Sequence, residues 1–489
     1  MSRWIAVALA SGALAGCAKV NPRPAFHQVD ELVSMRTGQH AQWIRSEAEA
    51  QQVAARVSAL LQDELTADAA VQVALLNNRS LQAEFEELGI SQADLAQAAL
   101  VSNPEFDGFG GFPGTSAAAH SYDFGIVQDF LSVLVQPLRK KVGAAQLELT
   151  KLRIGDSMLR LAAETKTAYY ALQARQQLVS RLQLILDINR TGAEFARRQH
   201  EAGNIGDLDL VNQQATYAQT KADLALAMAQ VRVDREALNR LLGLWGVDTD
   251  WKIADRLPEI PDQEIPLERL ESLAIEQRLD VDAARWGVDL VGRALALKKG
   301  TRYFPVGIHI GIRTEREPEG GPAVRVWGPT LALQLPIFDT GRASIARLEA
   351  QYLQSQRQLE ALAIDARSEV REARDLLIAS RDLAAYYQTV LLPQRVQILD
   401  LTLRHYNMML KGAYDLLLAK QNEVSAEKAY IESWRDYWMA RTELERAVGG
   451  RLPGPPPATQ SGAEPAATQT APQSQTANSK EHDRHDDSP

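Results

Sequence analysis

Residues 303–313 read YFPVGIHIGIR, and residues 330–335 read TLALQL. In the first stretch apolar side chains occupy every second position, and in the second stretch leucine does so: Phe304, Val306, Ile308, Ile310, Ile312, Leu331, Leu333 and Leu335. This alternation predicts β-strands with one apolar and one polar face. With its flanks, each run is about ten residues long, which is the length of a tilted strand that crosses a bilayer. Because lipid does not tolerate an open sheet edge, the chain either assembles with copies of itself or does not span a membrane.

The N-terminus predicts export and lipidation. Arg3 precedes a short apolar run at 4–10, which is typical of a signal peptide and too short to span a bilayer. The run ends in Leu14-Ala15-Gly16-Cys17, and these small residues before the single cysteine of the chain resemble a bacterial lipobox. We therefore predict that residues 1–16 are a signal peptide and that Cys17 is acylated. An ordinary signal peptide followed by an incidental cysteine is the alternative. Lys19 stands where a lipoprotein retained in the inner membrane carries Asp, which favours delivery to the outer membrane.

Most of the remaining chain is predicted to be long helix. Residues 138–201 contain no proline, and a helix of this length extends roughly 95 Å at 1.5 Å per residue. Its apolar residues Leu147, Ile154, Leu161 and Ala168 recur every seven positions, which is the spacing of a coiled-coil seam. Further helices are predicted at 68–101, 207–243, 267–300, 340–391 and 415–448. The net charge of −9 argues against binding to nucleic acid.

The regions between the long helices set the predicted domain boundaries. Residues 17–66 are expected to form a lipidated N-terminal extended segment. Three prolines at 258, 261 and 266 indicate a linker over 246–266. Residues 451–489 are rich in Pro, Ala, Gln, Thr and Ser and are predicted to be disordered, because they contain too few large apolar side chains to form a core.

The two regions between these boundaries, 67–245 and 267–450, are predicted to be repeats. At a constant offset of 206 residues, identical residues recur in pairs: Asp209 and Asp415, Leu210 and Leu416, Arg235 and Arg441, Leu238 and Leu444, Arg240 and Arg446, Gly243 and Gly449. Two further strands are predicted in the first repeat, at about 104–112 and 121–131, from the alternation of Tyr122, Phe124 and Ile126 with other residues.

The predicted fold class is therefore mainly α with a small β part, built from two helix-strand-strand-helix repeats. Four β-strands per chain would complete a 12-stranded trimeric barrel, continued by a long α-helical barrel. Cyclic symmetry is the usual way to close such an assembly. The alternative is a helical bundle with two incidental hairpins, which does not explain strands of membrane-spanning length on an exported chain.

Several motifs resemble the TolC-type family of outer-membrane efflux channels, in its lipoprotein branch. The resemblance extends over about residues 67–450. The motifs are Ala74 to Asn78, Asn103-Pro104, Arg278-Leu279-Asp280-Val281, Tyr303-Phe304-Pro305, the phrase from Leu335 to Arg342, and two hairpin tips at 203–214 and 412–421. The resemblance implies a homotrimer in outer-membrane lipid that serves as a passive exit duct. It also implies two partners, a periplasmic adaptor protein and an inner-membrane pump.

The two hairpin tips contain the candidate functional residues. Asp207, Asp209 and Asp415 follow the predicted turns, where an acidic residue caps a helix and interacts favourably with its dipole. In a trimer the same carboxylates would form rings at the periplasmic mouth and act as a gate that attracts cations. Capping alone and a combined role of cap and gate both remain open. The turns themselves are candidate adaptor contacts: Gly203, Asn204, Ile205, Gly206, Gly412, Ala413 and Tyr414.

No pattern of an enzyme is present in the sequence. The glycine-rich stretch near Gly108 has Pro113 where a dinucleotide fingerprint requires glycine, and no helical His-Glu-x-x-His pattern occurs. We therefore predict no catalytic activity, no cofactor and no bound metal. The leading hypothesis is an outer-membrane exit duct of a tripartite efflux system. A periplasmic coiled-coil structural or adaptor lipoprotein is the alternative, and it needs neither four membrane-length strands nor a trimer.

Overall fold

The computed structural model describes residues 20–112, 121–261, 269–302, 308–317, 324–333 and 337–452. The helices are α2 (Arg23–Thr37), α3 (Glu47–Gln62), α4 (Ala67–Asn77), α5 (Arg79–Ala98), α6 (Phe130–Glu201), α7 (Asp207–Leu242), α8 (Leu270–Gln277), α9 (Leu279–Thr301), α10 (Arg342–Tyr386), α11 (Leu392–Asn407) and α12 (Ala413–Val448), with a 3₁₀ turn at Gly246–Thr249. The strands are β1 (Glu105–Gly111), β2 (Ser121–Asp129), β3 (Ile308–Glu317) and β4 (Val324–Leu333). Among these helices, none combines the length and the apolar character that a membrane-spanning helix needs.

The order of elements confirms two helix-strand-strand-helix repeats. However, each repeat begins with two helices where the sequence predicts one. The predicted helix 68–101 is divided at Asn78 into α4 and α5, and the predicted helix 267–300 is divided at Arg278 into α8 and α9. Both dividing residues have an extended backbone, with ψ of 119° and 124°. The side chain of Asn78 then accepts a hydrogen bond from Leu81 N and caps α5.

These two breaks connect the beginning of each repeat to its end. Asn78 Nδ2 donates to the carbonyl of Leu241 at 2.9 Å, in the last turn of α7. Arg278 Nη1 lies 3.4 Å from the carbonyl of Ala447, in the last turn of α12. Because the last carbonyls of a helix have no partner within it, these contacts satisfy groups that would otherwise be unpaired. In an uninterrupted helix, neither side chain would reach these carbonyls.

The long helices are confirmed, and two of them extend beyond the predicted bounds. α6 contains 72 residues, or about 108 Å at 1.5 Å per residue, and starts at Phe130 because Asp129 caps it. The predicted helix 340–391 continues as a π-helical turn at Tyr387–Leu391 and then as α11. Pro393, near the start of α11, has no backbone N–H to donate, so the wider turn preserves the helix where the regular hydrogen-bond ladder is interrupted.

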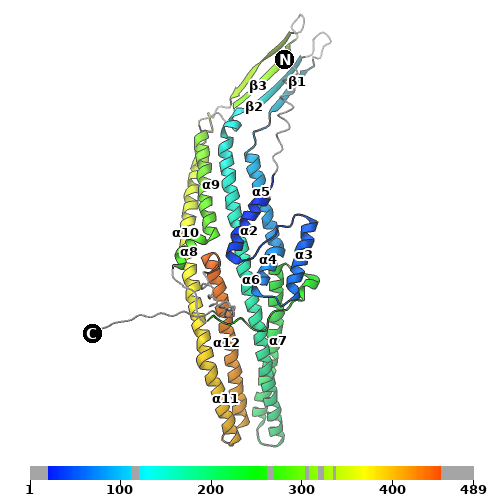
Figure 1. Cartoon of the computed structure of the whole chain (residues 1–489), viewed down its shortest axis with the longest axis vertical. Helices are drawn as coiled ribbons and strands as arrows, with labels where there is room; N and C mark the ends of the chain where they lie inside the picture. The colour runs from blue at the N-terminus through cyan, green and yellow to red at the C-terminus, as the bar shows by residue number, and fades with distance from the viewer. Residues whose placement is uncertain are drawn as a thin grey trace, which may run out of the picture. The chain divides into compact units, whose positions relative to one another are not determined.

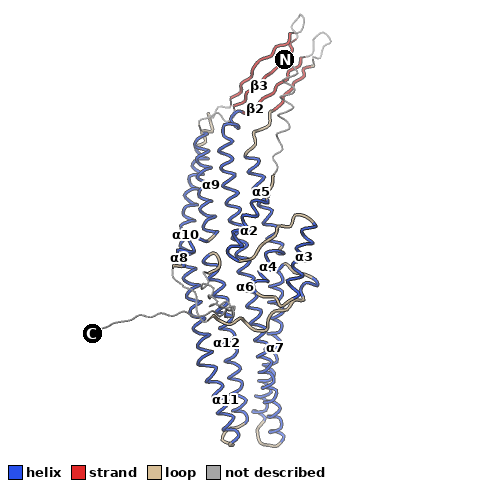
Figure 2. The backbone as a smooth tube through the Cα atoms, in the orientation of Figure 1, coloured by secondary structure: helices blue, strands red, loops and turns tan. Residues whose placement is uncertain are grey.

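The four strands form one antiparallel sheet in the order β1-β2-β3-β4. The central pair joins the two repeats, with Ile126 opposite Ile312. β2 ends at Asp129 and α6 begins at Phe130, so the strand continues directly into the longest helix. Figure 2 shows the strands at one end of the long helices and the turns that follow α6 and α11 at the other end.

The N-terminal segment differs from the prediction. Residues 17–66 are predicted to be extended, yet the described part contains α2 and α3. In α2 the buried side chains Phe26, Val29 and Val33 follow a helical spacing and pack into the main core. The ring of Phe26 lies 5.0 Å from that of Phe85 in α5. The prediction is wrong because it overlooks this short apolar stripe, which packs as a helix.

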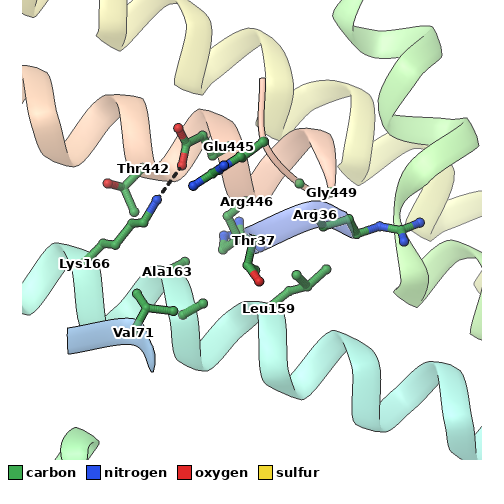
Figure 3. A pocket seen from close by; sticks show the side chains of 13 residues that line it. Arg36, Thr37, Val71, Leu159, Ala163, Lys166, Thr442, Glu445, Arg446 and Gly449 are labelled. Atoms are coloured by element: carbon green, nitrogen blue, oxygen red, sulfur yellow. Dashed lines mark hydrogen bonds and ion pairs between the residues drawn. The ribbon is translucent and has the colours of Figure 1, made fainter. Parts of the chain in front are cut away.

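α2 also bridges the two repeats. Arg36 Nη2 donates to the carbonyl of Gln277 at 3.2 Å, and the main-chain N–H of Arg451 donates to the carbonyl of Arg36 at 3.1 Å. Next to this bridge, Figure 3 shows a cavity between α2, α6 and α12 in which Lys166 and Glu445 point toward one another. Their charged atoms are 3.1 Å apart. The N-terminal helix is therefore part of the folded core of the two repeats.

The predicted linker is partly described, over residues 246–261. Its main chain pairs with the segment before α4, where Leu65 N donates to Lys252 O at 2.8 Å. The indole N–H groups of Trp434 and Trp438 both donate to the carbonyl of Pro258, at 2.8 and 2.9 Å. The predicted signal peptide, Cys17 and nearly all of the predicted disordered tail lie outside the described residues.

Candidate functional site

The sheet has one face that is apolar and exposed. The register places the following side chains on this face: Phe106, Tyr122, Phe124, Ile126, Ile310, Ile312, Trp327, Leu331 and Leu333. All of them are exposed, with Trp327 at 75% and Phe106 at 69%. Such a wide apolar surface on a sheet marks contact with lipid or with a partner.

The opposite face of the sheet is polar. It contains Asp107, Asp123, Arg313 and Glu315 among the described side chains, together with the small residues Gly125, Gly311 and Gly328. Arg313 pairs with Asp107 at 3.1 Å and lies 3.5 Å from Asp123. A sheet with one apolar and one polar face is the form that a barrel strand takes between lipid and water. The alternation in the sequence therefore predicted the two faces, with exceptions: the register places Phe109 and Val326 on the polar face and Arg316 and Arg325 at positions of the apolar face.

The first hairpin tip connects α6 to α7. Gly203 has a φ of +76°, and Asn204 N donates to the carbonyl of Gln199, which closes α6 as a Schellman motif. Asp207 Oδ1 lies 2.7 Å from His200 Nε2. The side chain of Asp209 is exposed and makes no hydrogen bond or ion pair among the residues that the structure describes.

The second tip connects α11 to α12 with the same backbone geometry. Met409, at the position related to Gly203, has a φ of +59°, and Leu410 N donates to the carbonyl of His405. A left-handed conformation is unfavourable for a non-glycine residue. Asp415 accepts a hydrogen bond from Gly412 N at 3.0 Å and lies 3.6 Å from Lys411 Nζ. This aspartate is thus a helix cap, whereas Asp209 makes no such bond.

The structure brings two of the predicted tip residues together across the hairpins. Tyr414 of α12 packs edge-on against Phe195 of α6, with ring centroids 5.4 Å apart. Burial raises the pKa of Tyr414, and the nearby carboxylate of Asp209 raises it further. The Tyr414 hydroxyl is buried and has no hydrogen-bond partner among the described residues. The charge of Asp209 on one hairpin therefore acts on a hydroxyl of the neighbouring hairpin.

The exposed part of the tips differs from the predicted contact residues. Ile205, Ala413 and Tyr414 are half-buried, whereas Gly203, Asn204, Gly206 and Gly412 are exposed. The most exposed apolar side chains of the second tip precede the predicted residues: Met408 at 61%, Met409 at 94% and Leu410 at 68%. The sequence analysis missed this apolar tip cluster (Met408, Met409 and Leu410), although three consecutive apolar residues before a Lys-Gly turn were a visible signal.

The helical layer and the sheet each end on both sides in an element that has a neighbour on its inner side only. α6 packs against α7 and α12, and α11 packs against α12, so α7 and α11 lie at the two sides of the helical layer. Both expose apolar side chains: Leu208, Val211, Leu226, Met228 and Val233 on α7, and Val396, Ile398, Leu401, Leu403 and Tyr406 on α11. β1 and β4 are likewise the edge strands of the sheet in the described part of the chain.

Comparison with protein families agrees with this architecture. The sequence profile of the outer membrane efflux protein family matches residues 138–244 and 270–450. The chain belongs to this family. It is therefore an outer-membrane efflux channel with a periplasmic helical part, and it is not an enzyme, as the sequence analysis predicts. The match also sets aside the alternative of a coiled-coil structural or adaptor lipoprotein.

Individual proteins are similar to this efflux protein in sequence or in structure, at low sequence identity. The cobalt-zinc-cadmium resistance protein CzcC of Cupriavidus metallidurans is 23% identical over 394 residues, which cover 79% of this chain and 90% of CzcC. The outer membrane channel CmeC of Campylobacter jejuni is similar in structure, with a TM-score of 0.67, 15% identity and coverage of 78% and 85%. The open-state channel MtrE of Neisseria gonorrhoeae gives a TM-score of 0.59, 18% identity and coverage of 78% and 88%.

Proposed function

We propose that three copies of this efflux protein close into one duct, with twelve strands in the outer membrane and long helices in the periplasm. The observation that carries the proposal is the pair of open sides, where β1 and α7 or β4 and α11 present unpartnered edges. Unpaired strand edges are not tolerated in lipid, and cyclic symmetry pairs the β1 edge of one copy with the β4 edge of the next. Twelve is an even number of antiparallel strands, as in other outer-membrane barrels.

The proposed partners follow from the two ends of the duct. The apolar face of the sheet contacts outer-membrane lipid. The helical tips receive a periplasmic adaptor, which connects the duct to an inner-membrane pump. Contact residues are the exposed tip positions and the apolar tip cluster, because exposed apolar side chains on a polar surface favour a protein partner. We also propose that the cargo includes divalent transition-metal cations, on the basis of the name of the relative CzcC.

Two neighbouring residues on β4 test this arrangement. Leu331 lies on the apolar face and Ala332 on the polar face. A lysine on the lipid-facing side of a barrel costs about 2–4 kcal/mol at the middle of the bilayer and less toward its surfaces, and Leu331 lies two residues from the end of β4. We expect Leu331→Lys to reduce the trimer in outer-membrane fractions and tolerance of Co²⁺, Zn²⁺ and Cd²⁺ in a strain that lacks the gene. Ala332→Lys, which introduces the same charge on the water-facing side, should preserve the trimer.

The measurements are the native mass of the detergent-solubilised protein and growth in the presence of each metal. A parent protein that is only monomeric would refute the duct. Equal loss of trimer in both variants would show that the two faces are not divided between lipid and water. A parent that is trimeric but does not change metal tolerance would refute the proposed cargo and leave the duct intact.

Lipidation at Cys17 is the other part of the proposal. The support is the sequence before Cys17, which resembles a lipobox. We expect Cys17→Ala to abolish labelling by a radioactive fatty acid and to weaken membrane retention. The barrel should still insert, since twelve strands bury far more apolar surface than the acyl chains of one anchor. Unchanged labelling in the variant would contradict acylation at this residue.

A further inference from the structure

Most charged residues of the sheet lie on its polar face. Among the strand side chains that the structure describes, this face contains five carboxylates and one guanidinium group: Glu105, Asp107, Asp123, Asp129, Glu315 and Arg313. Among the described strand residues, the register of the apolar face includes charged residues at positions 316 and 325 alone, where β3 ends and β4 begins. Arg313 is therefore the single described positive charge on the polar face, a strongly acidic surface.

Arg313 contacts one of these carboxylates on the neighbouring strand and another on the strand beyond it. The register aligns Asp107 of β1, Gly125 of β2 and Arg313 of β3 in one row. Arg313 Nη2 lies 3.1 Å from Asp107 Oδ2, although β2 lies between the two strands. Its Nε lies 3.5 Å from Asp123 Oδ1. One guanidinium group thus neutralises carboxylates from two strands.

Gly125 makes this contact across β2 possible. A Cβ atom on Gly125 would lie 2.4 Å from Asp107 Oδ1, which is closer than two such atoms can approach. The absence of a side chain leaves room for Asp107 to lie over the strand and meet Arg313. This is a position where glycine serves the close approach of another residue to the backbone.

The contact leaves the face acidic. Asp123 is directly opposite Glu315 in the register, and like charges in directly opposed positions repel each other. Arg313 lies beside this pair and offsets part of the repulsion. The remaining carboxylates keep a net negative field on the water-facing side, and a charged wall in a narrow pore selects ions of the opposite sign.

We propose that Arg313 sets the ion selectivity of the strand-lined part of the duct by limiting its negative field. The inference rests on the proposed trimeric duct, in which the polar face lines the pore. It assigns selectivity to the row of Asp107, Gly125 and Arg313, far from the helical tips. Loss of the guanidinium group leaves the carboxylates unopposed and favours cations, whereas loss of one carboxylate has the opposite effect.

The experiment measures the reversal potential of single channels in planar bilayers under a KCl gradient. We expect Arg313→Gln to shift the reversal potential toward the equilibrium potential of K⁺, and Asp107→Asn to shift it toward that of Cl⁻. The double variant Arg313→Gln with Asp107→Asn has the net charge of the parent and should return near the parental value. Arg56→Gln, on the exposed surface of α3, makes the same charge change away from the sheet and should have no effect.

Each other outcome overturns the inference. A trimeric Arg313→Gln channel with the parental reversal potential would show that this row does not control selectivity. Shifts of the two single variants in the same direction, without recovery in the double variant, would indicate a disturbed fold rather than a field. If the parent itself forms trimers but no channel, the proposed duct fails, and that result is distinguishable because no reversal potential exists to compare.

Discussion

Arg278→Ala should be one of the most destabilising substitutions in this efflux protein, with a loss of about 3–5 kcal/mol in stability. The guanidinium group is nearly fully buried at the break between α8 and α9. Its Nη2 lies 2.7 Å from Asp280 Oδ2, and its Nη1 lies 2.7 Å from Glu369 Oε2 in α10. Removal of the arginine leaves Asp280 without this partner and Glu369 with Arg446 alone, at 3.1 Å, and also removes the contact with the last turn of α12.

The same cluster makes stability depend on pH. Burial acts to raise the pKa of Asp280, but the hydrogen bonds and the charge of Arg278, together with main-chain hydrogen bonds, outweigh it and hold the pKa below its ordinary value. A carboxyl whose pKa is depressed by folding stabilises the protein above its unfolded pKa and loses this contribution as the pH falls through the folded pKa. The parent should therefore lose stability in acid below about pH 4, and Arg278→Ala should show a weaker acid dependence.

Thermal unfolding followed by circular dichroism at several pH values provides the test. Arg357→Ala is the matched control, because Arg357 pairs with Glu360 on the exposed surface of α10, where an ion pair contributes about 0–1 kcal/mol. Equal melting temperatures for the two variants would show that the buried cluster contributes no more than a surface pair.

The fold was predictable where a strict pattern repeats along the chain. Alternation in β3 and β4 predicted the strands and their faces, and proline-free heptads predicted α6. The offset of 206 residues predicted that Asp209 and Asp415 occupy equivalent tip positions, and both are the third helical residue after a glycine N-cap. The strands and α6 depend on residues that are close in sequence, and the equivalent tips follow from two local motifs that match at a fixed offset.

The unpredicted features depend on contacts between distant residues. Asn78 and Arg278 divide helices because their side chains bind carbonyls more than 160 residues away. The row of Asp107 and Arg313 requires the strand register, which no residue pattern gives across two repeats. α2 was missed because its apolar stripe is short and gains its helical structure from packing on α6.

Asp209→Asn together with Asp415→Asn should change gating strongly while the fold remains intact. In a trimer three copies of each carboxylate surround the periplasmic mouth, and their repulsion and affinity for cations depend on charge. Asp209 has no capping bond to lose, and Asn at position 415 still accepts the hydrogen bond from Gly412 N. We expect higher single-channel conductance, or loss of block by multivalent cations, in planar bilayers.

The contact between the hairpins adds an independent check on Asp209. Burial raises the pKa of Tyr414, and the charge of Asp209 raises it further, because a nearby carboxylate disfavours the tyrosinate. Asp209→Asn alone should therefore lower the pKa of Tyr414 toward its ordinary value, as measured by the change in tyrosine absorbance relative to a Tyr414→Phe protein. This measurement tests whether the carboxylate lies beside the neighbouring hairpin, whatever its effect on conductance.

Two controls separate a gate from a cap. Asp63→Asn removes one negative charge at the C-terminal end of α3, away from the tips. This variant should conduct like the parent. Asp207→Asn removes a carboxylate that already pairs with His200 at 2.7 Å, so its effect should be smaller than that of the double variant. If the trimeric double variant conducts and is blocked like the parent, Asp209 and Asp415 have no gating role, and the structure then assigns capping to Asp415 alone.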